Sequence, residues 1–457
     1  MIGSMSLEEI RAVFGGSLSG MDAVFTSVSI DTRTLEPGDL FIALTGPKFN
    51  GNDYVGVAEQ KQAVAAIVTE DVASDLPALK VEDARKTLGV IGSLNRSRST
   101  ARIIAMTGSQ GKTTVKGMTA AILANCTDVF MTQGNLNNDL GVPLSLASIE
   151  AQHEFAVIEL GANGPGEIAY TAGLTRPDIA HITNIAGTHL EGFGSLDGVA
   201  SAKSEIWQGI VENGTAVINI DDSFADQFID QISRDPVRKH IVTVSGSGKQ
   251  NADFYAGDAN LEDFRCSNFT LVSPIGEVRV SLKVAGRHNI NNAVAAAAMA
   301  ISAGAGLSEV KSGLESFVPV KGRMCMLGGL KGAVVIDDTY NASPSSFHAA
   351  IDVLEITAGT TIVVMGDMGE LGDEAKQLHS EVGLYARNKG VDHLIAVGEL
   401  SGLAAESFGE NGITLSDRES FLDTIQPLLD QSVIVLVKGS RSQGMEDLVR
   451  QIQAGDV

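Results

Sequence analysis

The stretch ARIIAMTGSQGKTTVKGMTAAILAN, residues 101–125, decides the fold of the middle of the chain. Its first part is an apolar run that predicts a buried strand. Its last part places Val115, Met118 and Ile122 on one face of a helix. A glycine-containing turn joins the two. A strand, a glycine turn and a helix in this order form the setting of a phosphate-binding loop for nucleotides.

The turn has the residue types that bind a triphosphate. Gly108 and Gly111 let backbone N–H groups face an anion, and the helix N-terminus adds partial positive charge. Lys112 can reach the β- and γ-phosphates, and the Thr113 hydroxyl can bind Mg²⁺. An ordinary glycine turn beside a lysine is the alternative, and the strand–helix setting argues against it. The predicted phosphate-binding loop comprises Gly108, Ser109, Gln110, Gly111, Lys112, Thr113 and Thr114.

The loop departs from the most common phosphate-loop spacing. That spacing would place its first glycine at position 106, where the chain has Met106. The departure argues against ordinary GTPases and motor ATPases, as does the lack of a guanine-reading N-K-x-D motif. The sequence NKGVD at 388–392 is one residue too long and lies in another part of the chain. We therefore expect a different class of ATP enzyme.

Composition restricts the partners and the compartment. The chain of 457 residues has 33 basic and 56 acidic side chains, a formal charge of −23, which argues against binding to nucleic acid or anionic membranes. Its 3 cysteines lie far apart, as expected in a reducing cytosol. The alanine-rich run at 293–307 is too short to span a bilayer and predicts a buried helix. We expect a cytoplasmic protein without stable membrane insertion, and a monomer by default.

Apolar runs with polar or glycine-rich ends divide the chain into three segments. Residues 1–98 mix short strands and turns. Residues 99–318 alternate strands and helices, which predicts a parallel sheet with its ligands at the carboxyl ends of the strands. Near SFVPVKGRM the pattern begins again, and residues 319–457 predict a second doubly wound domain. We expect an α/β fold with three domains, of which the second is a central P-loop parallel-sheet ATPase domain and the third a C-terminal Rossmann-like domain.

Further motifs resemble one enzyme family. TGSQGKTT resembles the loop of the Mur ligases, the ATP-dependent amide-forming enzymes of peptidoglycan synthesis. GNLNNDLGVPLSL, ELGANGPGEI, HLEGFGS, AGRHNINNAVAA, DDTYNASPSS, GDMGELG and KGSR follow in family order. The resemblance covers nearly the whole chain and is most specific from Ala105 to Ser346. It implies ATP-dependent joining of D-alanyl-D-alanine to UDP-N-acetylmuramoyl-tripeptide through an acyl phosphate.

The resemblance also implies a metal site. Glu159 follows an apolar strand, where a carboxylate suits Mg²⁺, although an exposed strand-end acid would look the same. His189 alone more often indicates a loop or core histidine, and Lys203 alone a solvated helix lysine. By resemblance, these three residues and Thr113 hold Mg²⁺, with Lys203 carbamylated. The implied catalytic residues are Lys112, Glu159, His189 and Lys203.

Polar residues at the segment joins have implied nucleotide roles. By resemblance, Asn292 lies on the adenine side, while Arg323, Asp338 and Asn341 face ATP across the cleft between the second and third domains. This placement implies domain closure around the nucleotide. Lys438 and Arg441 follow a strand, near the dipeptide or the phosphates. A helix C-cap for Asn341 and a surface ion pair for Arg441 are the alternatives.

Other residues are expected to bind the carboxylate substrate. Ser29 and Arg33 lie in the segment that, by resemblance, binds the UDP-sugar. Amide side chains of GNLNN can bind the substrate, or can serve a turn; they are Asn135, Asn137 and Asn138. The sequence departs from the family pattern at Asn50, Asn52 and Gly369, and no basic residue precedes the last Met-Glu. These departures bear on the first domain and the dipeptide side.

Two kinds of alternative function are open from the sequence. One is a sister Mur ligase that adds a single amino acid, or a folate polyglutamylating relative; GNLNND and DDTYNASP argue against both. The other is a P-loop nucleotide switch without synthetic activity, against which Glu159, His189 and Lys203 argue. The third residue of the tripeptide, lysine or diaminopimelate, is not determined by the sequence.

Overall fold

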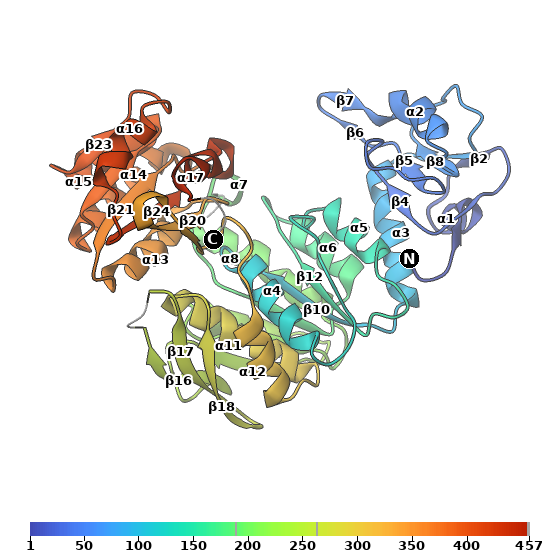
Figure 1. Ribbon diagram of the computed structural model, residues 1–457. Helices are drawn as coiled ribbons and strands as arrows, with labels where there is room; N and C mark the ends of the chain where they lie inside the picture. Colours follow the sequence, from blue (N-terminus) through green and yellow to red (C-terminus); the bar gives the residue numbers. More distant parts are fainter. Residues whose placement is uncertain (188–189, 262–263, 455–457) are drawn as a thin grey trace.

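Three large sheets, one in each domain, organise the structure (Figure 1). The computed structural model describes residues 1–187, 190–261 and 264–454. The N-terminal and C-terminal domains form separate lobes above the central domain in this view. The α/β class and the three-domain organisation predicted from the sequence are confirmed. The boundaries expected at residues 98 and 318 fall at the end of α3 (Ala84–Arg98) and after α12 (Leu307–Ser316), and they stay predictions.

The N-terminal domain is built on a five-stranded sheet in the order β2-β9-β8-β5-β4. All its strand pairs are parallel except that of β2 with β9. Helices α1 and α3 pack on one face of the sheet and α2 on the other. The elements are β1 (Met5–Ser6), α1 (Leu7–Phe14), β2 (Ser17–Ser19), β3 (Val24–Phe25), β4 (Val28–Ser29), β5 (Leu40–Ile42), β6 (Thr45–Gly46), β7 (Phe49–Asn50), η1 (Gly51–Tyr54), α2 (Val55–Gln60), β8 (Ala65–Val68) and β9 (Ala78–Lys80).

The central domain has a nine-stranded sheet in the order β11-β12-β10-β13-β14-β15-β16-β17-β18. Pairs from β11 to β16 are parallel, so the carboxyl ends of these strands lie at one edge. The strands are β10 (Arg102–Thr107), β11 (Val129–Met131), β12 (Phe155–Glu159), β13 (Ile179–Ile182), β14 (Thr215–Asn219), β15 (His240–Ser245), β16 (Phe254–Asn260), β17 (Ser267–Ser273) and β18 (Gly276–Leu282).

Helices cover both faces of the central sheet. One core lies under α4, α11 and α12, and the other lies under α5, α6, α8, α9 and α10. The run at 293–307 lies mostly in α11, whose middle is buried, as predicted. No helix of the described residues has both the length and the apolar character needed to cross a bilayer. The helices are α4 (Lys112–Leu123), α5 (Gly141–Ala147), α6 (Glu167–Thr175), α7 (Leu190–Phe193), α8 (Leu196–Ser204), α9 (Ile206–Gly209), α10 (Ala225–Ser233) and α11 (Arg287–Ser302).

Three strands at the edge of the central sheet were not predicted. β16 pairs with β17, and β17 pairs with β18, in antiparallel register. A tight turn before Gly276 joins β17 to β18. Their alternating pattern buries one face only, through side chains such as Phe269, Leu271 and Val280. One exposed face is typical of antiparallel strands, whereas the buried parallel strands read as continuous apolar runs. The predicted parallel sheet therefore continues into two antiparallel pairs at this edge.

The C-terminal domain has a six-stranded sheet in the order β19-β20-β24-β21-β22-β23. Only the β19–β20 pair is antiparallel, and the sequence missed the short edge strands β19 and β23. Ser343 caps α13, and Pro344 is the first residue of the helix. The elements are β19 (Cys325–Gly328), η2 (Leu330–Gly332), β20 (Val334–Asp338), α13 (Pro344–Glu355), β21 (Thr360–Met365), η3 (Gly372–Glu374), α14 (Ala375–Asn388), β22 (His393–Ala396), α15 (Glu399–Phe408), β23 (Gly412–Thr414), α16 (Phe421–Ile425), η4 (Gln426–Leu428), β24 (Val433–Lys438), η5 (Arg441–Gln443) and α17 (Glu446–Ile452).

A buried amide ties the N-terminal and central domains together. Asn95 on α3 is fully buried, and its Nδ2 donates to the carbonyls of Leu146 at 2.8 Å and Ile149 at 2.9 Å. Its Oδ1 accepts a hydrogen bond from the Ile2 N–H at 2.7 Å. Asn95 therefore joins the chain start, α3 and the end of α5 in one buried cluster.

Asn95→Ala is expected to lower the free energy of unfolding by about 3 kcal/mol, because it leaves buried backbone groups without partners. Denaturant unfolding measures this change. Asn125→Ala is the matched control, since its amide also bonds helix carbonyls but is exposed. We expect a change of about 0.5 kcal/mol or less for the control. Equal changes for both variants would contradict the assigned role of Asn95.

Candidate active site

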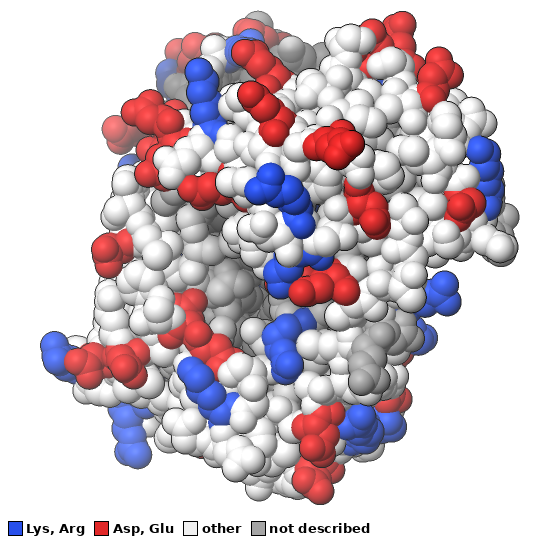
Figure 2. Space-filling view, turned by 90° about the vertical axis from the view of Figure 1, so that its left-hand side faces the viewer, with Lys and Arg blue, Asp and Glu red and all other residues white. Residues whose placement is uncertain are grey.

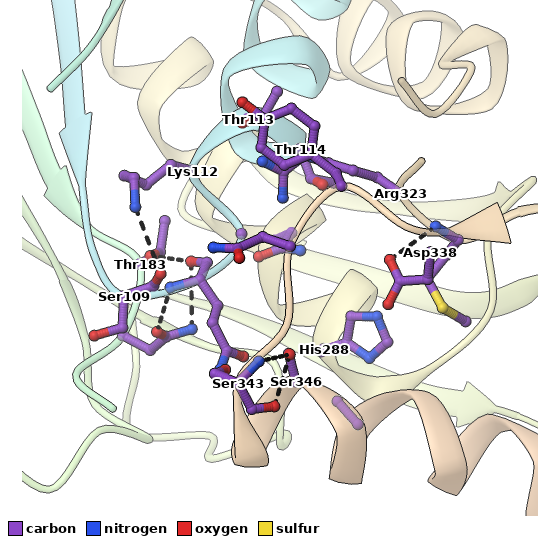
Figure 3. A pocket seen from close by; sticks show the side chains of 18 of the residues that line it. Ser109, Lys112, Thr113, Thr114, Thr183, His288, Arg323, Asp338, Ser343 and Ser346 are labelled. Atoms are coloured by element: carbon purple, nitrogen blue, oxygen red, sulfur yellow. Dashed lines mark hydrogen bonds between the residues drawn. The ribbon is translucent and has the colours of Figure 1, made fainter. Parts of the chain in front are cut away.

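The predicted phosphate-binding loop lies between β10 and α4, which are the strand and helix expected on either side of it (Figure 3). Gly108 has φ 144° and Gly111 has φ 79°, backbone conformations that L side chains rarely adopt. A Cβ atom on Gly108 would lie 1.9 Å from the Thr183 Oγ1, and one on Gly111 would lie 2.6 Å from the Asn292 Oδ1. Both glycines are therefore required by the fold of the loop as well as by its approach to an anion.

The residues after β13 hold the loop in place. The Ser109 N–H donates to the Asn184 carbonyl at 2.9 Å, and the Gln110 N–H donates to the Asn184 Oδ1 at 3.0 Å. The Ser109 Oγ accepts from the Ala186 N–H at 2.9 Å, and the Thr183 hydroxyl donates to the Gln110 carbonyl. The loop is thus fixed in the structure, which lowers the ordering cost of binding an anion.

Lys112, the first residue of α4, folds back over the loop. Its Nζ donates to the Gly108 carbonyl at 2.6 Å. Burial lowers the pKa of its ammonium, Glu159 acts in the opposite direction, and Arg323 lowers the pKa further. In Figure 3, Lys112 lies on the same side as Ser109 and Thr183. The residue places a cation beside the loop, at the N-terminus of α4, and that arrangement suits a phosphate.

Glu159 is the last residue of β12 and is 2% exposed. Its Oε1 accepts from the Asn137 amide at 2.8 Å and lies 3.4 Å from the Thr113 hydroxyl. Its Oε2 lies 3.1 Å from the Nζ of Lys116. Burial raises the pKa of Glu159, but Lys116 and Lys112 lower it more, so the net shift is downward. The carboxylate is therefore ionised at neutral pH, and the alternative of an exposed strand-end acid is wrong.

The pair of Thr113 Oγ1 and Glu159 Oε1 fits a hard cation, because Mg²⁺ takes oxygen ligands and keeps several waters or phosphate oxygens. Within the described ranges, no group of three His, Cys, Asp or Glu side chains could hold a metal ion.

The C-terminal domain contributes the opposite wall of the site. The Nζ of Lys438 donates to the Asp338 Oδ2 at 2.6 Å and to the Asn341 carbonyl at 2.8 Å. The guanidinium of Arg323 lies 4.1 Å from the ring centroid of Tyr340. Asn341 follows β20 and does not end a helix, so the C-cap alternative is wrong. Arg441 forms the surface ion pair that was its alternative, at 3.0 Å from Glu446, and it also lines the cavity.

A cavity of about 620 Å³ lies between the two walls. Figure 2 looks onto the side of the molecule on which the C-terminal and central domains lie. It shows a hollow between the upper and lower parts of this face. The Gln110 side chain crosses between the domains and donates to Ser343 at 2.9 Å and to Ser345. The expected site residues that line the cavity are Ser109, Gln110, Gly111, Lys112, Thr113, Thr114, Asn135, Asn137, Asn138, Glu159, Asn292, Arg323, Asp338, Asn341, Lys438 and Arg441.

Other predicted residues lie elsewhere. Ser29 and Arg33 belong to the N-terminal domain, and the Arg33 side chain is 87% exposed and pairs with Asp31 at 2.6 Å. The guanidinium lowers the pKa of Asp31 to about 2. Asn50 and Asn52 form a local network: Asn52 bonds Thr69 and Asn50, whose amide donates to Glu70 at 2.7 Å. These asparagines therefore have structural partners where the family pattern has other residues.

Lys203 is buried in α8 and is 1% exposed, so the alternative of a solvated helix lysine is wrong. Its ammonium lies 5.7 Å from the ring centroid of Phe193, and it forms no ion pair within the described part of the chain. Burial and the charge of Lys112 lower its pKa well below the usual range. His189, the third member of the expected metal site, lies outside the described residues.

Several residues of the site were missed by the sequence analysis. Lys116 is buried against Glu159 one helical turn after Lys112, and this i, i+4 spacing on α4 was the available signal. His181 and His288 line the cavity, and burial lowers the pKa of both. No local motif indicated them. Asn137 and Asn138 also serve the fold, since Asn138 accepts from the Gly141 N–H at 2.9 Å at the start of α5.

His181 is expected to make stability depend on pH. Burial lowers its pKa from 6.5 to about 4, and the Nδ1 lies 2.9 Å from the Val217 carbonyl. The unfolded chain therefore binds a proton between these two pH values and the folded protein does not. The contribution of His181 to the free energy of unfolding is therefore fully present above pH 6.5. It decreases as the pH falls toward 4, by about 3 kcal/mol at most.

Unfolding of the wild type and of His181→Leu, measured from pH 7.5 to about 4, checks this prediction. All other ionisable groups are the same in both proteins, so the difference in slope belongs to His181. We expect a flatter profile for the variant. Parallel profiles would contradict the neutral, buried state of this histidine.

Comparisons with known proteins agree with this geometry. Three family models match: "Mur ligase family, catalytic domain" at residues 24–103, "Mur ligase middle domain" at 106–300 and "Mur ligase, glutamate ligase domain" at 322–441. A protein of Escherichia coli (strain K12), named UDP-N-acetylmuramoyl-tripeptide–D-alanyl-D-alanine ligase, is 41% identical over 452 residues, 98% of each chain.

Two solved structures share the arrangement over nearly the whole chain. MurF from Acinetobacter baumannii has a TM-score of 0.92 and 34% identity, and the match covers 98% of each chain. MurF ligase from Thermotoga maritima in complex with ADP has a TM-score of 0.82 and 27% identity, covering 93% of this chain and 96% of the other.

Proposed function

Because the chain belongs to the Mur ligase family, we propose that it joins D-alanyl-D-alanine to UDP-N-acetylmuramoyl-tripeptide in an ATP-dependent reaction of peptidoglycan precursor synthesis. The observation that carries the proposal is the position of Lys112 and Glu159 on one wall of a cavity whose other wall belongs to the C-terminal domain. The substrates come from the relative of 41% identity over 98% of both chains.

The reaction has to activate a carboxylate, which is a poor acyl donor. A carboxylate oxygen attacks the γ-phosphorus of ATP, the bond to ADP breaks, and an acyl phosphate forms. The amine of the dipeptide then attacks the acyl carbon, inorganic phosphate leaves, and the amine loses a proton. Catalysis of such a transfer is mostly positioning and electrostatic stabilisation. The N–H groups of the phosphate-binding loop and the Lys112 ammonium supply both at the γ-phosphate.

A magnesium ion fits the oxygen pair of Thr113 and Glu159, and we propose that they bind it with His189 and a carbamylated Lys203. When bound, Mg²⁺ neutralises charge on the phosphates. The protein's part is to hold the Glu159 carboxylate ionised and oriented beside the loop. The downward shift of the Glu159 pKa supports this role.

The C-terminal domain is proposed to complete the nucleotide site, with Arg323, Asp338 and Asn341 facing ATP and Asn292 on the adenine side. All four line the same cavity as Lys112. We assign the UDP-sugar to Ser29 and Arg33 in the N-terminal domain and the rest of the carboxylate substrate to Asn135, Asn137 and Asn138.

We also propose a cytoplasmic location.

Phosphate release in a matrix of substrates tests the proposed function. We expect release only when ATP, UDP-N-acetylmuramoyl-tripeptide and D-alanyl-D-alanine are all present. Lysine and diaminopimelate versions of the tripeptide, each tested separately, identify its third residue. Equal or faster turnover with single amino acids would favour a sister ligase. Phosphate release without either substrate would favour a nucleotide switch.

A further inference from the structure

Lys116 is a buried cation beside the phosphate-binding loop that has no part in the proposed reaction. It lies on α4, one turn after Lys112, and is 4% exposed. Its Nζ has two partners: the Glu159 Oε2 at 3.1 Å and the Gly134 carbonyl at 3.2 Å. Burying a lysine is costly unless it is paired and hydrogen-bonded. Both contacts together meet that requirement.

The first contact determines which oxygen of Glu159 faces the loop. Because Lys116 holds Oε2, the Oε1 is directed to the Thr113 hydroxyl and the Asn137 amide. Lys112 is the other cation near this carboxylate. Lys116 provides the ion pair to Glu159, whereas the Lys112 ammonium donates to the Gly108 carbonyl at 2.6 Å. The buried carboxylate therefore has a cationic partner other than Lys112.

The second contact reaches the segment that carries the substrate-side asparagines. We define the asparagine loop as residues 133–138, which connect β11 to α5. Asn137 joins it to Glu159 through its amide and to the Gly161 N–H through its carbonyl, at 2.7 Å. Asn138 fixes the end of the loop at the Gly141 N–H. Lys116 fixes its beginning, at Gly134, to the nucleotide-binding helix.

We propose that Lys116 is a positioning residue that couples the orientation of Glu159 to the asparagine loop, so that the nucleotide side and the carboxylate-substrate side of the site are held in register. This inference rests on the proposed function for its kinetic consequence. Its structural consequence, the ordering of the loop by Lys116, does not depend on the reaction.

Hydrogen exchange of the ligand-free full-length protein tests the structural part. Lys116→Met keeps most of the side-chain volume and removes the charge. We expect at least ~10-fold faster exchange of the Leu136, Asn137 and Gly161 amides, with little change in the β10 amides. Lys116→Gln, which keeps a donor, should give an intermediate rise, and it stands in if the methionine variant does not fold.

Lys239→Met is the matched control, because Lys239 also has a buried side chain paired with a carboxylate, Asp235, and is absent from the residues lining the cavity. It should lower the melting temperature without selective exchange in the asparagine loop. In the ligation assay, Lys116→Met should raise the KM for UDP-N-acetylmuramoyl-tripeptide by ~10-fold and lower kcat, and Lys239→Met should change neither.

A stabilising role alone predicts a different pattern for Lys116→Met: a lower melting temperature, uniform exchange and unchanged kinetic constants. That pattern would overturn the proposal. If the wild type lacks ligase activity, the proposed function fails, while loop-selective exchange would still support the coupling. If the wild type is active but the loop amides are unaffected, the coupling fails and the proposed function stands.

Discussion

Lys112→Met is expected to abolish ligation, with kcat falling by ~10³-fold or more, while the fold is kept. The loss has a physical cause: the ammonium at the phosphate-binding loop stabilises charge on the transferring phosphoryl group, and a preorganised group of this kind contributes several kcal/mol. The substitution also removes the hydrogen bond from the Lys112 ammonium to the Gly108 carbonyl, which is a small part of the stability of the domain.

Three measurements check this variant: the rate of phosphate release, the melting temperature and the affinity for ADP. Lys239→Met serves as the control for loss of a lysine outside the cavity. A Lys112→Met protein that melts like the wild type and turns over at a similar rate would show that the loop has no catalytic role.

Lys203→Ala is expected to lose most ligase activity and to recover part of it with formate. A buried ammonium that has no ion pair among the described residues is unfavourable, and burial and Lys112 shift its pKa downward. The neutral amine that results can add to CO₂, giving a carbamate and releasing a proton. The carbamate is an anion with two oxygens, which suits a hard cation.

Carbon NMR of the metal-free protein in ¹³C-bicarbonate tests this modification without an activity assay. The wild type should show one carbamate signal that disappears in Lys203→Ala. Lys239→Ala should keep it. A wild type without the signal, together with an alanine variant of ordinary turnover and no response to formate, would remove Lys203 from the site.

Local patterns were sufficient to predict the elements that form the proposed nucleotide site. The strand, glycine turn and helix at residues 101–125 form β10, the loop and α4, because the signals of periodicity and backbone freedom act within a few residues. The position of Glu159 at the end of β12 follows from the general geometry of parallel sheets.

The missed features depend on contacts between distant parts of the chain. Lys116 reads as an ordinary polar residue of a helix until the fold places Glu159 and Gly134 beside it. Lys203 also looks like an ordinary polar residue of a helix in the sequence, because its burial arises from the packing of α8 and not from its neighbours in sequence. The contact of Gln110 with Ser343 joins residues 233 positions apart, which no motif spacing can indicate.

Transfer of oxygen from the carboxylate substrate to phosphate tests whether the substrate is activated as an acyl phosphate. UDP-N-acetylmuramoyl-tripeptide labelled with ¹⁸O in its terminal carboxylate is ligated with D-alanyl-D-alanine and ATP, and the released phosphate is examined by mass spectrometry. Activation through an acyl phosphate predicts one ¹⁸O atom in the inorganic phosphate for each amide bond formed. Amide formation with unlabelled phosphate, or with the label in AMP, would contradict this mechanism.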